Sequence, residues 1–230
     1  MLTPIATRTL DDPKLKLGVL SLLFLVSGFG AIFASSSLGN FAIRRRELDR
    51  SDYSTLFWIT SILGSSAFLI LALSSMPICY WMGIEEWYIG LSVIAFSIVP
   101  SSLSGLLNAV LRRRKQFLYI FFLSLIQCMV VILVTSFMLL NGFDLWAYIY
   151  VKVIVACILC VFGLWLVELP EWKLKKPLCR EAYQYTRGLI GFNAINYWSR
   201  NLDNVLVGSC LGADALGCLL YTSPSPRDRG

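Results

Sequence analysis

The stretch from Gly188 to Gly212 most constrains what this chain can fold into. Its sequence, GLIGFNAINYWSRNLDNVLVGSCLG, is long enough to cross a bilayer as a helix, yet it carries an arginine, an aspartate and several asparagines. On a helix these polar side chains share a stripe about 100° wide, and apolar side chains cover the opposite side. The stripe consists of Asn193, Asn196, Arg200, Asp203 and Asn204.

Such a stripe is costly in lipid. An arginine or aspartate at the centre of a lipid-exposed helix costs about 2.5 to 3.5 kcal/mol on insertion scales. We therefore expect the stripe to face a bundle interior or a water-filled cavity, which makes its five residues candidates for a substrate cavity. The alternative is that Arg200 and Asp203, three positions apart, form an internal ion pair on a helix at the membrane surface.

The composition indicates a polytopic membrane protein. Of the 230 residues, 57% are hydrophobic, and the mean hydropathy of +0.69 excludes an ordinary soluble domain. The net charge of +6 would favour a nucleic-acid or acidic-lipid partner if the basic residues formed a patch. They lie instead in short clusters between apolar runs, so we expect no nucleic-acid partner.

Residues that commonly carry enzyme chemistry are scarce. The chain contains no histidine, which removes the usual general base and metal ligand at neutral pH. Among the seven cysteines, Cys157 and Cys160 have CxxC spacing, but their neighbours are apolar, which favours two small membrane-helix residues over a redox or zinc pair. We expect no catalytic residue, no cofactor and no metal site.

Five apolar spans precede the polar stretch. They cover about 17–43, 53–75, 88–111, 117–140 and 143–167. In the third span, Pro100 predicts a kink that faces the interior, because neighbours or water must satisfy the backbone groups that a proline frees. In the fifth span, Lys152 could either snorkel to the interface or face a cavity, and the sequence favours neither orientation.

The connections between the spans alternate in charge. Lysines and arginines number four in 44–52, none in 75–87, four in 112–116, none in 141–144 and five in 168–187. This positive-inside pattern places the basic connections in the cytoplasm. The first span then runs inward and leaves residues 1–16 outside, although they are basic. This mismatch predicts an earlier span that the sequence lacks.

These signals also divide the chain. We expect a first group of five helices in 1–168, a cytoplasmic linker in 169–187, and the first helix of a second group in 188–217. The last stretch, 218–230, breaks the membrane pattern abruptly with CLLYTSPSPRD. It looks like a translated sequencing-library adapter, so we expect it to be foreign to the protein, the alternative being a native Ser/Pro tail.

Two stretches of the chain resemble a known family. They read RTLDDPKLKLGVLSLLFLVSGFGAIFASSSLGNFAIRRRELDRSDYSTLFW and YWSRNLDNVLVGSCLGADALG. Both are similar to the Wzx-type polysaccharide flippases of the multidrug/oligosaccharidyl-lipid/polysaccharide exporter superfamily. The family's seventh-helix motif is matched at Arg200, Asp203, Val207, Gly208, Leu211, Gly212, Leu216 and Gly217. The family's first motif is degraded over residues 8–18.

The resemblance implies an all-α, polytopic transmembrane helix bundle from a two-lobe, alternating-access exporter. Residues 1–168 would hold helices two to six of the N-terminal lobe, and 188–217 would be the first helix of the C-terminal lobe. The implied substrate is a lipid-linked oligosaccharide on polyprenyl pyrophosphate, carried across a bacterial or archaeal cytoplasmic membrane for O-antigen, capsule or exopolysaccharide synthesis. An arginine fork suits pyrophosphate oxygens, and asparagines suit sugar hydroxyls.

Two other functions stay open. A cation-coupled multidrug antiporter of the same superfamily would favour carboxylates in its cavity, and Asp203 is the carboxylate available within a span. A polytopic membrane glycosyltransferase or ligase would need acidic or histidine catalysts on a sizeable outer loop, and the visible outer loops are short.

Overall fold

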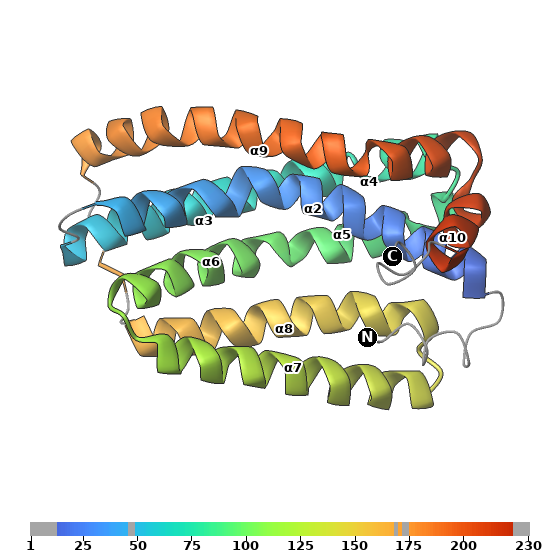
Figure 1. The fold of residues 1–230 in the computed structure, drawn as a ribbon, viewed down its shortest axis with the longest axis horizontal. Coiled ribbons are helices and arrows are strands. Elements are labelled where there is room, and N and C mark those ends of the chain that lie inside the picture. Colours follow the sequence, from blue (N-terminus) through green and yellow to red (C-terminus); the bar gives the residue numbers. More distant parts are fainter. Residues whose placement is uncertain (1–12, 46–48, 168–169, 172–174, 223–230) are drawn as a thin grey trace, which may run out of the picture.

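The computed structural model describes residues 13–45, 49–167, 170–171 and 175–222, and the regular structure in these ranges is helical throughout. The long helices lie side by side in a bundle (Figure 1). In chain order the helices are α2 (Pro13–Arg44), α3 (Arg50–Leu73), α4 (Ser75–Trp81), the 3-10 helix η1 (Glu85–Trp87), α5 (Tyr88–Phe96), α6 (Ile98–Arg113), α7 (Phe117–Leu140), α8 (Asp144–Val167), α9 (Lys176–Cys210) and α10 (Ala213–Thr222). The all-α prediction is confirmed.

Five segments of the described chain are long and apolar enough to cross a membrane. They are Leu15–Ile32, Arg50–Leu73, Glu85–Arg113, Phe117–Leu140 and Asp144–Val167. These segments confirm the five spans expected from the sequence. Helix α9 is not among them, because charged and amide side chains lower its hydropathy. A sixth crossing within 188–212 therefore stays a prediction.

The third span is broken where its proline predicts. Helix α5 ends at Phe96 and α6 begins at Ile98, since Pro100 has no N–H group to give to a carbonyl one turn earlier. The N–H of Ser97 bonds instead to the carbonyl of Ile94 at 2.9 Å. Ser97 is buried, so the break between α5 and α6 faces the interior of the bundle, as expected.

Helix α9 already begins at Lys176, within the second half of the expected linker over 169–187, and the division of the chain at this linker stays a prediction. Pro177 sits in the first turn of α9, where a missing N–H breaks no helical hydrogen bond. Leu178 and Ala182, four residues apart, are both buried and fix this end of α9 against the bundle. Residues 168–169 and 172–174 lie outside the described residues.

The expected single helix over 188–217 is two helices. Helix α9 ends at Cys210, and Gly212 adopts a φ of +88°, a left-handed conformation that glycine adopts without steric cost. Helix α10 then runs to Thr222, so it includes the start of the tail that we expect to be foreign. Residues 223–230 lie outside the described residues, and the origin of this tail stays a prediction.

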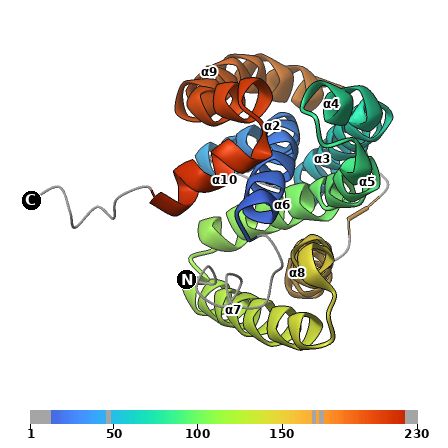
Figure 2. The same cartoon turned by 90° about the vertical axis from the view of Figure 1, so that its right-hand side faces the viewer.

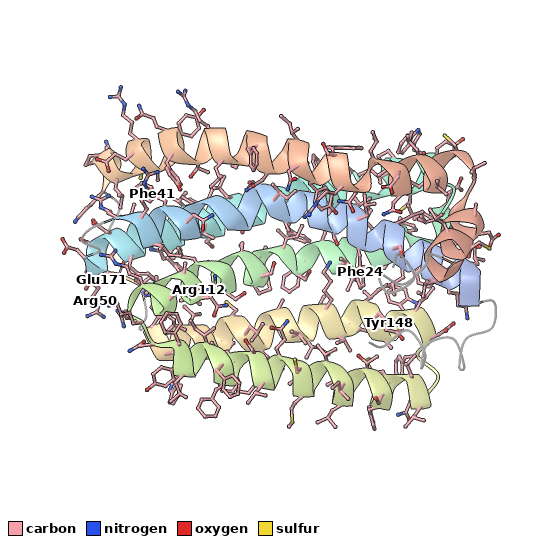
Figure 3. All side chains as sticks on the ribbon, viewed as in Figure 1. Phe24, Phe41, Arg50, Arg112, Tyr148 and Glu171 are labelled. Atoms are coloured by element: carbon pink, nitrogen blue, oxygen red, sulfur yellow. The ribbon has the colours of Figure 1, made fainter. Side chains whose placement is uncertain are left out.

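The basic connections gather at one end of the bundle, which we call the basic end. Arg50, Arg112 and Glu171 mark it in Figure 3. The opposite end holds α4, α10 and the start of α2, where the Lys16 ammonium pairs with the Asp144 carboxylate. Viewed along the helices, α9 lies beside α2, and α7 and α8 lie on the far side of the bundle (Figure 2).

Candidate substrate-binding surfaces

Helix α9 splits the predicted polar stripe between two environments. Asn193 and Asn204 are half-buried toward the bundle, whereas Asn196, Arg200 and Asp203 are exposed. In the described part of the chain, no ion pair joins Arg200 to Asp203, so the structure gives no support to an internal pair. Three of the five residues thus form an exposed polar flank, which we define as Asn196, Arg200 and Asp203.

Tyr197 fixes the rotation of α9 that exposes this flank. Its hydroxyl donates a hydrogen bond to the carbonyl of Leu25 at 2.6 Å, and its ring lies 6.0 Å from that of Phe29. The contact depends on Gly28, because a Cβ atom there would lie 2.6 Å from the Tyr197 hydroxyl. Small residues allow this kind of close approach between membrane helices. The polar flank is therefore turned away from α2 by a defined contact.

A half-open cavity with several serines and a lysine among otherwise apolar lining residues lies between α2, α6, α7 and α8. Its volume is about 310 Å³. Lys152 enters it from α8, and its ammonium donates a hydrogen bond to the Ser27 hydroxyl at 2.7 Å. The same nitrogen lies 4.5 Å from the centroid of the Phe24 ring. Lys152 therefore faces the interior, which decides between the two orientations that the sequence left open.

Serine hydroxyls give this cavity an accepting character. Ser27, Ser97, Ser101 and Ser104 line it, and each donates its proton to a carbonyl of its own helix. Their oxygen lone pairs are left to face the cavity. No carboxylate among the described residues pairs with Lys152. Its ammonium is stabilised instead by the hydroxyl of Ser27 and the ring of Phe24. The cavity can hold water or the hydroxyl groups of a polar ligand.

A charged joint at the basic end ties α9 to α3. Asp52 is buried, and the Lys175 ammonium donates to its carboxylate at 2.8 Å, with Arg45 3.6 Å from the other oxygen. The hydrogen bond to Asp52 raises the pKa of Lys175, opposed by partial desolvation. The backbone N–H of Glu171 donates to Ser54 at 2.8 Å, so the described residues just before α9 are held along the first turns of α3.

Five apolar spans and a half-buried lysine define a multi-pass helical membrane protein. A family model described as "polysaccharide biosynthesis protein" matches residues 13–223, so the chain belongs to this family of membrane proteins. The chain is also similar to an uncharacterized membrane protein in the cps region of Klebsiella pneumoniae, with 29% identity over 85 residues. That match covers 36% of this chain and 18% of the relative. No solved structure matches the chain.

The sequence predicted that all five polar residues of α9 face the bundle interior or a water-filled cavity, whereas Asn196, Arg200 and Asp203 are exposed, and their role stays a proposal. The sequence did not identify the full lining of the cavity at Lys152. Lys152 stood out as a charge in an apolar run, whereas nothing in the sequence linked it to Ser27, which lies 125 positions earlier. The serines around Pro100 were the available signal, because they indicated a polar interior near the kink. The sequence did not predict the ion pairs of Asp52. Its partners lie in basic clusters, and the positive-inside pattern already accounts for those clusters.

Proposed function

We propose that this protein is a flippase that moves lipid-linked oligosaccharide repeat units from the cytoplasmic to the outer leaflet of a bacterial or archaeal cytoplasmic membrane. The glycan is destined for O-antigen, capsule or exopolysaccharide. Family membership and the cps-region relative support a role in polysaccharide biosynthesis. The protein transports its substrate without covalent chemistry.

The observation that carries this proposal is the exposed Arg200 on a helix packed against membrane spans. The described residues give Arg200 no ion-pair partner, and the side chain points away from the bundle. A guanidinium offers several donors in a planar fork, which matches the oxygens of a pyrophosphate. Asn196 on the same flank offers both a donor and an acceptor to sugar hydroxyls. The flank therefore suits an anionic glycolipid.

The test is complementation of a flippase-deficient host by the full-length protein. We expect Arg200→Ala to abolish surface polysaccharide while the protein remains at normal abundance in the membrane, because an exposed arginine adds little to stability. Arg112→Ala, which removes an exposed arginine at the basic end, is the matched control and should keep export. An Arg200→Ala variant that is abundant and fully active would disprove the assigned role.

Asp203→Asn separates the flippase from the cation-coupled antiporter. A cavity for an anionic pyrophosphate loses a repulsive charge when the carboxylate is removed, so export should persist. An antiporter that uses Asp203 to bind its coupling cation would lose transport in this variant. Failure of the unmodified protein to restore surface polysaccharide, together with drug efflux that is lost in Asp203→Asn, would favour the antiporter over the flippase.

A further inference from the structure

Three apolar cavities follow one another along α9. Their volumes are about 360, 510 and 180 Å³. The first shares Leu63 and Ile190 with the second. The second shares Val26, Phe29 and Ile78 with the third. Shared lining residues make the cavities immediate neighbours, and we call the row of three the α9 groove.

The groove exists because α9 follows α2 and diverges from α3. Helix α9 contacts α2 extensively and α3 far less. Near the basic end the ring of Tyr185 lies 5.6 Å from that of Phe41, and near the opposite end Tyr197 bonds to Leu25, so α2 supports α9 along its length. The space left between α9 and α3 is floored by α2 and walled by apolar side chains such as Ala67 and Leu71.

The length of the groove selects among lipids. Lining residues on α9 run from Cys179 to Val205, which at about 1.5 Å per residue is about 39 Å. This distance exceeds the full thickness of a bilayer's hydrocarbon core, about 30 Å. An ordinary acyl chain occupies one leaflet, about half of that thickness. A groove of this length therefore suits a chain longer than a phospholipid acyl chain.

The two ends of the groove differ in chemistry. Arg187 lines the cavity nearer the basic end, is exposed, and has no ion-pair partner among the described residues. Trp81, Tyr197 and Trp198 line the cavity at the other end, which is the composition of a membrane interface. A cation in the cavity nearer the basic end, followed by apolar cavities, matches an amphiphile with a phosphate head and a long hydrocarbon tail.

We propose that the α9 groove holds the polyisoprenoid tail of a phosphate-headed carrier lipid, with the phosphate at Arg187. This inference rests on the proposed function, and it assigns the carrier lipid a bound state before export, distinct from the state in which its pyrophosphate meets Arg200. It concerns binding and not translocation, so a binding measurement can fail or succeed independently of export.

The experiment is photo-crosslinking of a long-chain polyprenyl phosphate, carrying a diazirine in its tail, to the full-length protein in nanodiscs. Ser66 is exposed, lines the groove, and bonds to its own helix at 2.9 Å, so Ser66→Phe fills the groove without breaking a tertiary contact. Ser124→Phe is the matched control, because Ser124 is an exposed serine on α7 with the same kind of intrahelical bond. We expect Ser66→Phe to lower crosslinking at least fivefold and Ser124→Phe to leave it unchanged.

The head-group assignment has its own pair of variants. Arg187→Gln should reduce the preference for polyprenyl phosphate over the uncharged polyprenol about tenfold. Arg180→Gln removes an exposed arginine on the same helix that lies outside the groove, and it should keep the preference. Crosslinked peptides should map to α3 and α9, and thermal melting of each variant checks that it is folded.

Three results would overturn the proposal. One is equal crosslinking in Ser66→Phe and wild type. Another is competition by phosphatidylglycerol that is as effective as competition by unlabelled polyprenyl phosphate, which would make the groove a site for ordinary bilayer lipid. A third is mapping of the crosslinks to α7 and α8. Specific crosslinking without restored export in the complementation assay would support lipid binding in the groove and contradict the proposed flippase function.

Discussion

Lys152 provides a sharp test of how this bundle tolerates a charge at membrane depth. It lies in α8, whose midpoint falls between residues 155 and 156, so its Cα is about 5 Å from the middle of the span. A lysine near the centre of a membrane helix costs about 2.5 to 3.5 kcal/mol on insertion scales. The hydrogen bond to Ser27 and the contact with the Phe24 ring oppose this cost.

The opposing contributions are of similar size. A hydrogen bond that involves a charged group contributes about 1.5 to 3 kcal/mol, and a cation over an aromatic ring about 0.5 to 2 kcal/mol. The two together nearly cancel the insertion cost. Because Met is apolar and similarly flexible, we expect Lys152→Met to change the free energy of unfolding by less than about 1.5 kcal/mol.

A double-mutant cycle isolates the contact between Lys152 and Ser27. Ser27→Ala alone leaves the ammonium without its acceptor and should cost about 1.5 to 3 kcal/mol. In the Lys152→Met background the same change should cost less than about 0.5 kcal/mol. Ser124→Ala on the exposed face of α7 is the control and should be neutral in both backgrounds.

The assay is unfolding in mixed micelles of increasing denaturing detergent, followed by circular dichroism of the helices. A decrease in the free energy of unfolding of more than about 3 kcal/mol in Lys152→Met would show that the contacts of Lys152 outweigh its insertion cost, contrary to the expectation. The expectation is equally contradicted by Ser27→Ala costing the same with and without the lysine, since the hydroxyl would then act through its bond to the Phe24 carbonyl.

Two further predictions follow from local geometry. Burial raises the pKa of Cys79 in α4 to about 11, its side chain is fully buried, and only the thiolate reacts with maleimides, so labelling of Cys79 should be negligible at pH 8. Mass spectrometry with the half-buried Cys179 as reference checks this, and equal labelling at pH 8 would contradict it. Gly208→Leu should cost about 1 to 3 kcal/mol by overpacking, because a Cβ at Gly208 would lie 2.6 Å from the Leu22 side chain. Gly188→Leu, on the same helix with open space around it, is the control, and equal losses in both variants would contradict the packing argument.

The five spans were predictable because each is a long apolar run bounded by charges or turn residues. Their signal is local: length and hydropathy identify a span whatever it packs against. The break before Pro100 was predictable for the same reason, since the missing N–H acts within one turn. These features need no knowledge of distant residues, and the structure contains all of them.

The start of α9 could not be found by the same signals. Three lysines, two arginines and Pro177 between 173 and 187 are typical of a polar connection, and a proline usually argues against a helix. Here the proline is in the first turn, and the buried series Leu178, Ala182 and Thr186 carries the helix along α2 and α3. That series has a helical period of four but contains one strongly apolar residue, so its burial depends on neighbours that the sequence does not identify.

The candidate site was predictable in part. The sequence placed five polar residues of α9 in one stripe, but the contact surface of α9 runs through Tyr197, Val205 and Gly208. Asn193 and Asn204 lie near this surface, and Arg200 lies beyond it. In a membrane the most apolar side chains face lipid, so hydropathy alone does not locate the surface that packs on protein. The orientation of Lys152 depended in the same way on a partner in a distant segment.

The unusual composition of α9 has a physical explanation if its three sides face three environments. The side of α9 that contacts α2 consists of small and aromatic residues, which allow the two helices to pack closely. A second side exposes Ile195, Leu202 and Leu206, which suits lipid. The polar flank needs water or a polar ligand, because Arg200 in hydrocarbon would cost about 2.5 to 3.5 kcal/mol. The mean hydropathy of α9 averages over these three sides, so it does not show whether the helix crosses the membrane. A helix of this kind is recognised in a sequence because it is long enough to cross a bilayer and yet carries charged side chains that hydrocarbon would not accept.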